Sequence, residues 1–334
     1  MADLKDKKIL ITGGAGFIGS HIADLLCDEG CSEIVIVDNM VRGRPENLEH
    51  ARARGHVRLV NGDIRDLNLL AELVEDADIV FHQAALRITQ CAAEPRDAME
   101  VMVQATFELL ELCAKYEIEK VIAASSASIY GMADQFPTTE LASAYNNRTL
   151  YGVAKSFNEQ LLRTFKEMYG LDYVALRYFN VYGPRMDIHG RYTEVLIRWM
   201  ERLQSGASPV IFGDGTQTMD FVHVRDVARA NILAAISGVN DDVFNVASGR
   251  ETSLAQLAEI LAKVMNREHL RPEFAPERSV NPVLRRLAST RKAEGLLGFR
   301  AGIGLQQGLR ELVEWWRAER DRSELSLATE AVGS

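Results

Sequence analysis

Short apolar runs recur along the first half of the chain. They cover residues 8–11, 33–37, 56–60, 78–81, 120–123 and 172–177, and they are rich in valine and isoleucine. Most of these runs are continuously apolar. This pattern is typical of strands that are buried on both faces of a parallel sheet.

Amphipathic stretches separate these runs and predict helices at about residues 20–29, 66–74, 96–116 and 150–169. A regular alternation of strands and helices indicates right-handed crossovers between parallel strands. We therefore predict an α/β fold of the Rossmann type, with a doubly wound parallel sheet and a smaller C-terminal α/β lobe.

A glycine-rich loop joins the first apolar run to the first predicted helix. Gly13, Gly16 and Gly19 allow, in turn, a tight turn, a close approach of the backbone to a pyrophosphate and close packing of helix on strand. Asp38 follows the second run, 19 residues after Gly19. Its carboxylate can accept hydrogen bonds from ribose hydroxyls and would repel a 2′-phosphate, so the pattern predicts NAD rather than NADP.

Other strand ends complete this predicted dinucleotide site. Small residues at Ala84 and Ala85 would let the dinucleotide approach the backbone. Arg42 and Arg44 could argue for NADP, but we expect them to lie in a solvated loop. The predicted NAD-binding residues are Gly13, Gly16, Phe17, Ile18, Gly19, Asp38, Asn39, Asp63, Ile64, Gln83, Ala84, Ala85, Tyr151, Lys155 and Tyr178.

The sequence becomes richer in turns after Gly183-Pro184. We predict an NAD-binding Rossmann domain in residues 1–183, with segments at about 216–247 that return to its sheet. Residues 184–320 would mainly form the substrate-binding lobe. The polar residues 321–334 predict a disordered tail.

Charge and composition exclude several classes of function. The formal net charge of −9 disfavours nucleic acid as a partner, since phosphate backbones require a basic face. The chain has no apolar stretch of about 18 residues, so we predict no membrane span. The first residues resemble no secretory signal, and we expect a cytoplasmic location. The 4 cysteines lack the spacing of metal ligands, and we predict no metal site.

Tyr151 and Lys155 lie four residues apart and would share one face of a helix. We expect the ammonium group to lower the pKa of the phenol. The phenol could then accept the proton of an alcohol while a hydride leaves for NAD. The spacing alone is common, and it gains meaning here because it follows a complete dinucleotide site.

With these motifs the chain resembles the extended short-chain dehydrogenase/reductase family, in its nucleotide-sugar epimerase and dehydratase branch, from residue 8 to about 318. The matching segments are 12–19, 38, 63–64, 125–131, 151–155, 177–185 and 220–224. The resemblance implies that Ser126 completes a catalytic set with Tyr151 and Lys155 and hydrogen-bonds the 4-oxygen of the sugar. It also implies a homodimer built through the helices at 96–116 and 150–169.

The same resemblance implies a substrate site for a nucleotide-linked sugar, with uridine as the family's commonest base. Asn180 would donate a hydrogen bond to the diphosphate, and Phe212 would lie beside the base. The predicted substrate-binding residues are Arg87, Ser126, Ser128, Asn180, Arg185, Phe212 and Arg286.

Two positions after Ser126 discriminate between reactions. Dehydratases of this family carry acidic residues just after the catalytic hydroxyl, and a decarboxylase would carry a glutamate there. Here the positions hold Ala127 and Ser128, which cannot act as acid or base at neutral pH. We therefore predict a 4-epimerase. The alternatives are a dehydratase with a displaced acid, a 4-keto-sugar reductase, or an NAD(H)-sensing binding module, which the intact catalytic set disfavours.

Several positions depart from the family pattern. Met219 stands where many relatives have an arginine that grips the diphosphate. Met102, Gln104 and Ala105 replace two asparagines and a glycine, and Met102 could alter the pocket near the nicotinamide. The candidates for the missing diphosphate charge are Arg185, Arg191, Arg225 and Arg285.

Arg285 or Arg286 falls where relatives gate the substituent at C2 of the sugar. One of the two could bind a carboxylate or phosphate of an unusual sugar. Alternatively, both are solvated.

Overall fold

A seven-stranded parallel sheet forms the centre of the molecule, a computed structural model that describes residues 3–188, 194–276 and 283–332. The strands run in the order β10-β6-β5-β4-β1-β2-β3. Their bounds are β1 Lys8–Thr12, β2 Glu33–Asp38, β3 Val57–Asn61, β4 Ile79–His82, β5 Lys120–Ser126, β6 Tyr173–Tyr178 and β10 Asp242–Val246. The strand order reverses between β1 and β4, where a crevice opens at the carboxyl ends of the strands.

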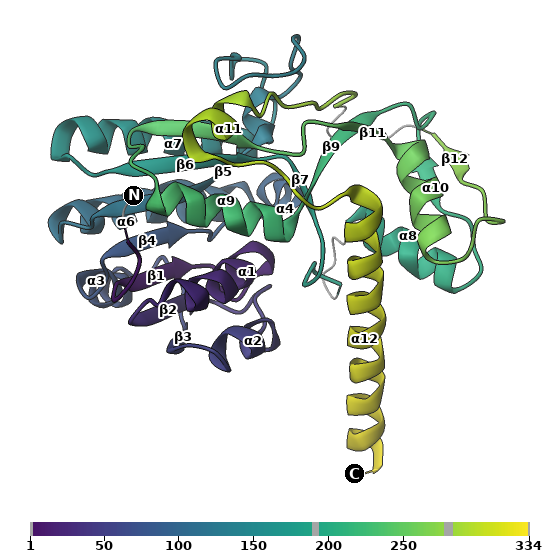
Figure 1. The fold of residues 1–334 in the computed structure, drawn as a ribbon, viewed down its shortest axis with the longest axis horizontal. Helices are drawn as coiled ribbons and strands as arrows, with labels where there is room; N and C mark the ends of the chain where they lie inside the picture. The colour runs from purple at the N-terminus through teal and green to yellow at the C-terminus, as the bar shows by residue number, and fades with distance from the viewer. Residues whose placement is uncertain (1–2, 189–193, 277–282, 333–334) are drawn as a thin grey trace.

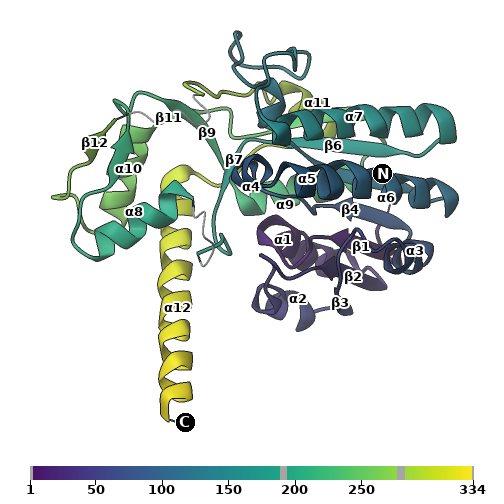
Figure 2. The same cartoon turned by 180° about the vertical axis from the view of Figure 1, so that it is seen from behind.

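Both faces of the sheet are buried, which explains the continuous apolar runs. On β1, Ile9 and Ile11 enter one hydrophobic core and Leu10 enters the other. The first core includes residues of α1 (Phe17–Leu26), α9 (Val224–Ile236) and α11 (Arg291–Leu297); the second includes residues of α3 (Leu67–Glu75), α6 (Ala105–Lys115) and α7 (Leu150–Tyr169). The predicted doubly wound Rossmann sheet is therefore confirmed (Figures 1 and 2).

A smaller lobe lies beside the sheet (Figure 1). It contains a three-stranded sheet, β11-β9-β7, and a two-stranded sheet, β12-β8. The elements are β7 Asn180–Tyr182, β8 Val210–Phe212, β9 Thr218–His223, β11 Glu251–Ser253, β12 Glu273–Ala275, α8 Val195–Gln204, α10 Leu254–Val264 and α12 Leu305–Val332. The buried indoles of Trp199 and Trp316 belong to the core of this lobe.

Shorter elements connect these layers: η1 Cys27–Glu29, η2 Pro45–Leu48, α2 Glu49–Arg52, α4 Ile88–Ala93, α5 Pro95–Met99, η3 Glu100–Gln104 and η4 Ala127–Tyr130. The helix predicted at 96–116 is thus divided into α5, a π-helical turn (η3) and α6. Such a turn inserts an extra residue into the helix and often occurs near a functional site.

The segment predicted to return to the main sheet does so only in part. Helix α9 packs on the main sheet and β10 extends it beside β6, as predicted. Strand β9, in contrast, pairs with β7 and β11 in the smaller lobe.

The structure differs from the predicted disordered tail, because residues 321–332 continue α12. Leu309 and Trp316 bury the first turns of this helix in the smaller lobe, and no glycine or proline interrupts the chain between Leu309 and Val332. Its second half extends away from the body of the molecule (Figure 2). Within the described part of the chain, no helix has the length and apolarity that crossing a membrane requires.

Candidate active site

A cavity of about 1150 Å³ opens at the carboxyl ends of the main strands and reaches the smaller lobe. Every residue predicted to bind NAD lies on its wall, so the structure brings together positions from Gly13 to Tyr178. Of the predicted substrate-binding residues, Arg87, Ser126, Ser128, Arg185 and Phe212 also line this cavity.

The glycine loop fits a bound pyrophosphate. Gly13 has φ +67°, and a Cβ there would stand 2.7 Å from the Cα of Ala84. Because α1 begins at Phe17, directly after this loop, its first N–H groups are unpaired within the helix and face the end at which anions bind. This local geometry is the one that a dinucleotide requires.

Asp38 has the surroundings expected of a ribose-binding carboxylate. It ends β2 and accepts hydrogen bonds from the backbone N–H groups of Ala15 (3.1 Å) and Met40 (3.0 Å). Burial raises the pKa of Asp38, and these two hydrogen bonds oppose that rise. The carboxylate is therefore held in place with acceptor capacity to spare.

Arg42 and Arg44, expected in a solvated loop, are both partly solvated, with side chains 34% and 38% exposed. Burial nevertheless lowers the pKa of the Arg42 guanidinium, and its Nε lies 3.5 Å from a carboxylate oxygen of Asp187. Arg87 approaches the same oxygen, at 3.4 Å. Asp187 thus links the loop after β2 to the loop after β4. Arg44 pairs with Glu46.

The predicted catalytic set lies where β5 meets α7. Ser126 ends β5, and its Oγ accepts a hydrogen bond from the N–H of Ser128 (3.1 Å). Tyr151 lies in the first turn of α7, and Lys155 lies one turn later. Gly152 allows the helix to come this close, since a Cβ there would stand 2.6 Å from the carbonyl oxygen of Ser128.

The electrostatics of Tyr151 differ from those predicted. Burial raises the pKa of the phenol, while a hydrogen bond with Ser126 and the nearby cations Arg42 and Arg286 lower it. Lys155 is not among these groups. Its Nζ donates to the carbonyl oxygen of Ala124 (2.6 Å), and burial lowers its pKa to about 8.

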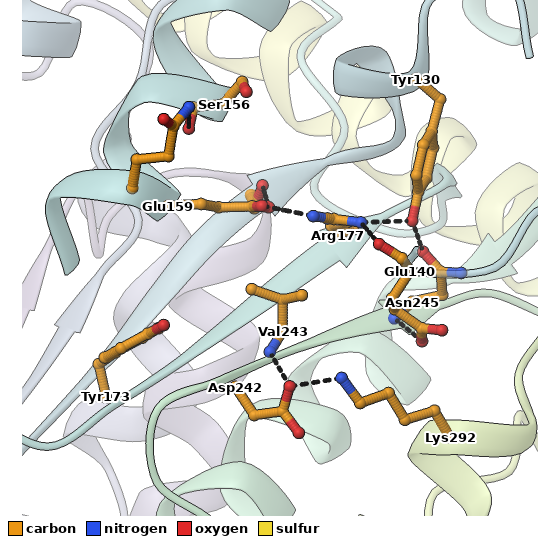
Figure 3. Close-up of polar contacts among 12 residues, drawn as sticks. Tyr130, Glu140, Ser156, Glu159, Tyr173, Arg177, Asp242, Val243, Asn245 and Lys292 are labelled. Carbon is orange, nitrogen blue, oxygen red and sulfur yellow. Dashed lines mark hydrogen bonds and ion pairs between the residues drawn. The ribbon is translucent and has the colours of Figure 1, made fainter. Parts of the chain in front are cut away.

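A buried ion pair between Glu159 and Arg177 lies on the same helix and the neighbouring strand (Figure 3). Arg177 on β6 donates from Nε to one oxygen of Glu159 (2.9 Å) and from Nη2 to the other (2.6 Å). Glu159 lies one turn after Lys155 on α7 and also accepts a hydrogen bond from Ser125. The pair therefore ties the helix that carries Tyr151 and Lys155 to the strand that ends in Ser126.

Hydrogen bonds connect Arg177 further, through Tyr130, to the neighbouring strand β10. Nη1 of Arg177 donates to the hydroxyl of Tyr130 (2.8 Å), which donates to Asn245 on β10 (2.6 Å). Figure 3 shows Arg177 between Glu159 on one side and Tyr130 on the other. One guanidinium thus orders the edge of the site across α7, β6 and the turn after β5.

Met102 does not line the cavity, contrary to the expectation that it could alter the pocket directly. It is 1% exposed, within the π-helical turn, and packs with Cys91 and Ala154 beside the partly buried Tyr151. Its sulfur accepts a hydrogen bond from the N–H of Leu86 (3.2 Å). Any effect of Met102 on chemistry would therefore act through neighbouring residues of the cavity wall, such as Leu86 and Tyr151.

The structure also separates the candidates for the missing diphosphate charge. Arg185 lines the cavity and pairs with Asp24 at 2.8 Å. Arg225 pairs with Glu311 and Arg285 with Glu251, both away from the described cavity wall. Arg191 lies outside the described residues. Asn180 and Arg286, both predicted to bind substrate, are absent from the described cavity wall.

Comparison with known proteins decides the family. Residues 9–247 match the model of the NAD-dependent epimerase/dehydratase family. The chain belongs to this family. It is thus an enzyme of the extended short-chain dehydrogenase/reductase type, and its cofactor is NAD.

Relatives within this family catalyse different reactions. The chain is 34% identical to a putative UDP-glucose 4-epimerase of Methanocaldococcus jannaschii, covering 92% of this chain and 98% of the relative. It is 30% identical to a UDP-N-acetyl-α-D-glucosaminuronate decarboxylase of Bacillus cytotoxicus, covering 93% and 98%. A solved UDP-N-acetylglucosamine 4-epimerase of Methanobrevibacter ruminantium, in complex with UDP-N-acetylmuramic acid, is 36% identical with a TM-score of 0.88, covering 94% and 99%.

Two cations of the cavity were not predicted from the sequence. Arg198 and Arg202, on α8 of the smaller lobe, also line the cavity. Their spacing of four residues places both on one face of the helix, while Trp199 and Met200 are buried in the lobe. The spacing is visible in the sequence, but only the tertiary structure shows that this face of α8 points into the cavity.

Proposed function

We propose that this family member is an NAD-dependent nucleotide-sugar 4-epimerase that acts on a UDP-linked sugar. One observation carries the proposal: Ser126, Tyr151 and Lys155 meet on the cavity wall, while Ala127 and Ser128 occupy the positions after the catalytic serine. This arrangement supports reversible oxidation of an alcohol and offers no carboxyl group there for elimination or decarboxylation.

Each residue has a defined task in this reaction. Ser126 hydrogen-bonds the phenol of Tyr151 and would orient the C4 hydroxyl of the sugar. Tyr151 would take the proton of that hydroxyl. It would return the proton after the 4-keto sugar has rotated to present its other face. NAD, which the glycine loop and Asp38 would hold, would supply a reversible acceptor for the C4 hydride. Lys155, whose pKa burial lowers to about 8, would hold the ribose and supply positive charge.

The other carboxylates of the described cavity wall are engaged elsewhere. Asp63 and Asp97 pair with an arginine on the loop after β3, and Asp187 and Glu194 pair with an arginine on the loop after β4. Asp38 binds backbone N–H groups at the ribose end. A dehydratase would need an acid and a base beside the sugar, and these carboxylates do not provide them.

The UDP part of the proposal rests on the arginines of the cavity. Arg87, Arg185, Arg198 and Arg202 line the cavity and could neutralise a diphosphate, and Phe212 could stack on a base. The relatives described above act on or bind UDP-sugars. Some of these sugars carry a carboxylate, so acidic UDP-sugars belong in any substrate screen.

The test is direct incubation of the purified enzyme, with no added cofactor, with UDP-glucose, UDP-N-acetylglucosamine and UDP-glucuronic acid. We expect NMR to show a C4 epimer with no net reduction of NAD, because the hydride returns to the sugar. A 4-keto or decarboxylated product would overturn the epimerase proposal and favour a dehydratase or decarboxylase.

We also propose a homodimer through α5, α6 and α7. Val153 and Phe157 are 53% and 44% exposed one turn apart on α7, and Met99 on α5 is 47% exposed. We expect Phe157→Glu to shift the protein from dimer to monomer in light scattering, since it places a charge in an apolar interface. Leu296→Glu, on the exposed side of α11 (55% exposed), is the matched control and should leave the dimer intact. A monomeric parent protein would contradict the proposal.

A further inference from the structure

The last helix of the chain, α12, belongs to the smaller lobe but also contacts the main domain. Leu309 and Trp316, which are 0% and 1% exposed, fix its first turns in the core of the smaller lobe. One turn later, Glu319 forms ion pairs with Arg44 of the main domain (3.8 Å) and with Arg322 of its own helix (3.7 Å). The middle turns of α12 therefore join the two parts of the molecule before the helix extends away from it (Figure 1).

A further ion pair extends this contact. Arg322 lies one turn after Glu319, and its Nη1 is 3.8 Å from a carboxylate oxygen of Glu49. Glu49 begins α2, and Ala51 of the same helix is buried in the core of the main domain. The side chains of Arg44, Glu319, Arg322 and Glu49 thus form a series of alternating charges between α12 and the segment that follows β2.

Glu319 is buried although it carries a charge. The residue is 8% exposed, whereas Glu314 and Arg317 on the same helix are exposed. A carboxylate is costly to bury unless cations or hydrogen-bond donors compensate it. Its burial beside Arg44 therefore indicates a packed contact between α12 and the main domain, which is more than an approach of two solvated side chains.

The segment that α12 contacts also holds the ribose end of the NAD site. The backbone N–H of Arg44 donates to the carbonyl oxygen of Ala15 (3.0 Å), and the side chain of Asn47 donates to the same oxygen (2.9 Å). The N–H of Ala15 in turn donates to Asp38 (3.1 Å). Gly43 lines the cavity, and a Cβ there would stand 2.5 Å from a carboxylate oxygen of Asp38. Arg44 is thus the next residue after the cavity wall and is tied to the glycine loop.

We propose that Glu319 is a positioning residue for bound NAD, acting through Arg44. The ion pair fastens the smaller lobe to the loop that holds the ribose. A ligand covered by a loop leaves only when the loop opens, so a contact that restrains the loop slows dissociation. Glu319 lies where the family resemblance ends, at about residue 318, so the family pattern supplies no role for it. The inference needs NAD as the cofactor but not the proposed 4-epimerase reaction.

The experiment measures how fast the holoenzyme, without any sugar, exchanges its bound NAD for radiolabelled NAD. Gel filtration separates the label that is bound to protein. Glu319→Gln keeps the shape of the side chain and removes its charge, and we expect it to speed the exchange about fivefold, the upper end for a partly exposed ion pair. Arg44→Gln should speed the exchange to a similar extent.

A double variant assigns the effect to the pair. Glu319→Gln combined with Arg44→Gln should exchange NAD no faster than Glu319→Gln alone, because both substitutions remove the same interaction. Raising the salt concentration from about 0.05 to 0.5 M should speed the exchange in the parent enzyme more than in the double variant, since screening weakens the pair. Glu314→Gln, exposed on the same helix, is the matched control and should leave the exchange rate unchanged.

Two outcomes would overturn the inference. The exchange rate could stay unchanged in Glu319→Gln or in Arg44→Gln, which would show that the pair does not restrain the cofactor. Alternatively, the two effects could multiply in the double variant, which would show that the residues act independently. Neither outcome touches the proposed reaction, because C4 epimerisation is measured separately with sugar present.

Discussion

Replacing Tyr151 by phenylalanine should reduce turnover by orders of magnitude while the protein keeps its NAD. Tyr151 lies on the cavity wall, is hydrogen-bonded to Ser126 and is the only group that we assign to take the C4 proton. Loss of a general base costs about 100- to 10,000-fold in rate. We therefore expect kcat to fall about 1000-fold, or about 4 kcal/mol of transition-state stabilisation.

The measurement pairs a kinetic assay with the NAD content of the purified protein. NAD released by denaturation should be the same for Tyr151→Phe and the parent enzyme. Tyr169→Phe, at the far end of the same helix and 58% exposed, removes one hydroxyl in the same way and should leave kcat unchanged. Turnover retained by Tyr151→Phe would remove this residue from the role of base.

Glu159→Gln should destabilise the protein and also change its pH dependence. Both side chains of the Glu159–Arg177 pair are 9% exposed, so the substitution leaves a buried guanidinium without its counter-charge. Although burial alone would lower the pKa of Arg177, Glu159 holds it above the ordinary value. Removing one partner of a buried pair costs about 3–5 kcal/mol, which we expect as a loss of unfolding free energy in urea titration.

The direction in which Glu159→Gln shifts the pH profile of kcat follows from the pKa of Lys155. Burial lowers the pKa of Lys155 to about 8, while Glu159 acts in the opposite direction. Without this carboxylate the pKa of Lys155 falls further, so the cation is lost at lower pH. The alkaline limb of the kcat profile should therefore move to lower pH.

The exposed Glu167→Gln on the same helix is the matched control for Glu159→Gln. Glu167→Gln should change the free energy of unfolding by less than about 0.5 kcal/mol and leave the pH profile of kcat unshifted. A profile that stays in place in Glu159→Gln, despite reduced stability, would limit Glu159 to a structural role. Such a result would leave the assignment of Tyr151 as the base untouched.

Much of the main domain follows from local sequence. The six apolar runs correspond to β1–β6 within one residue at their starts, because strands buried on both faces must be continuously apolar. The helix predicted at 150–169 has those bounds in the structure, with Thr149 capping its first turn and Gly170 ending it in the left-handed conformation. These signals lie within a few residues of the feature that they determine.

Other features depend on partners distant in sequence. The loop of Arg42 has a polar sequence typical of a solvated loop, but Arg42 pairs with Asp187, far along the chain, and its side chain is only 34% exposed. The polar composition of residues 321–332 favours disorder, whereas in the structure they continue α12. The pairing of Arg42 depends on a contact that local composition does not contain.

The sequence by itself indicated the glycine loop, the carboxylate at Asp38 and the set of Ser126, Tyr151 and Lys155, because each lies at a recognisable spacing at or after the end of a strand. The tertiary structure alone decided where each arginine lies. Arg285 and Arg286 are neighbours in sequence, yet one pairs with Glu251 on the surface and the other faces the catalytic turn. Burial and the identity of the facing group determine the free energy of a charge, and both arise only when distant segments pack together.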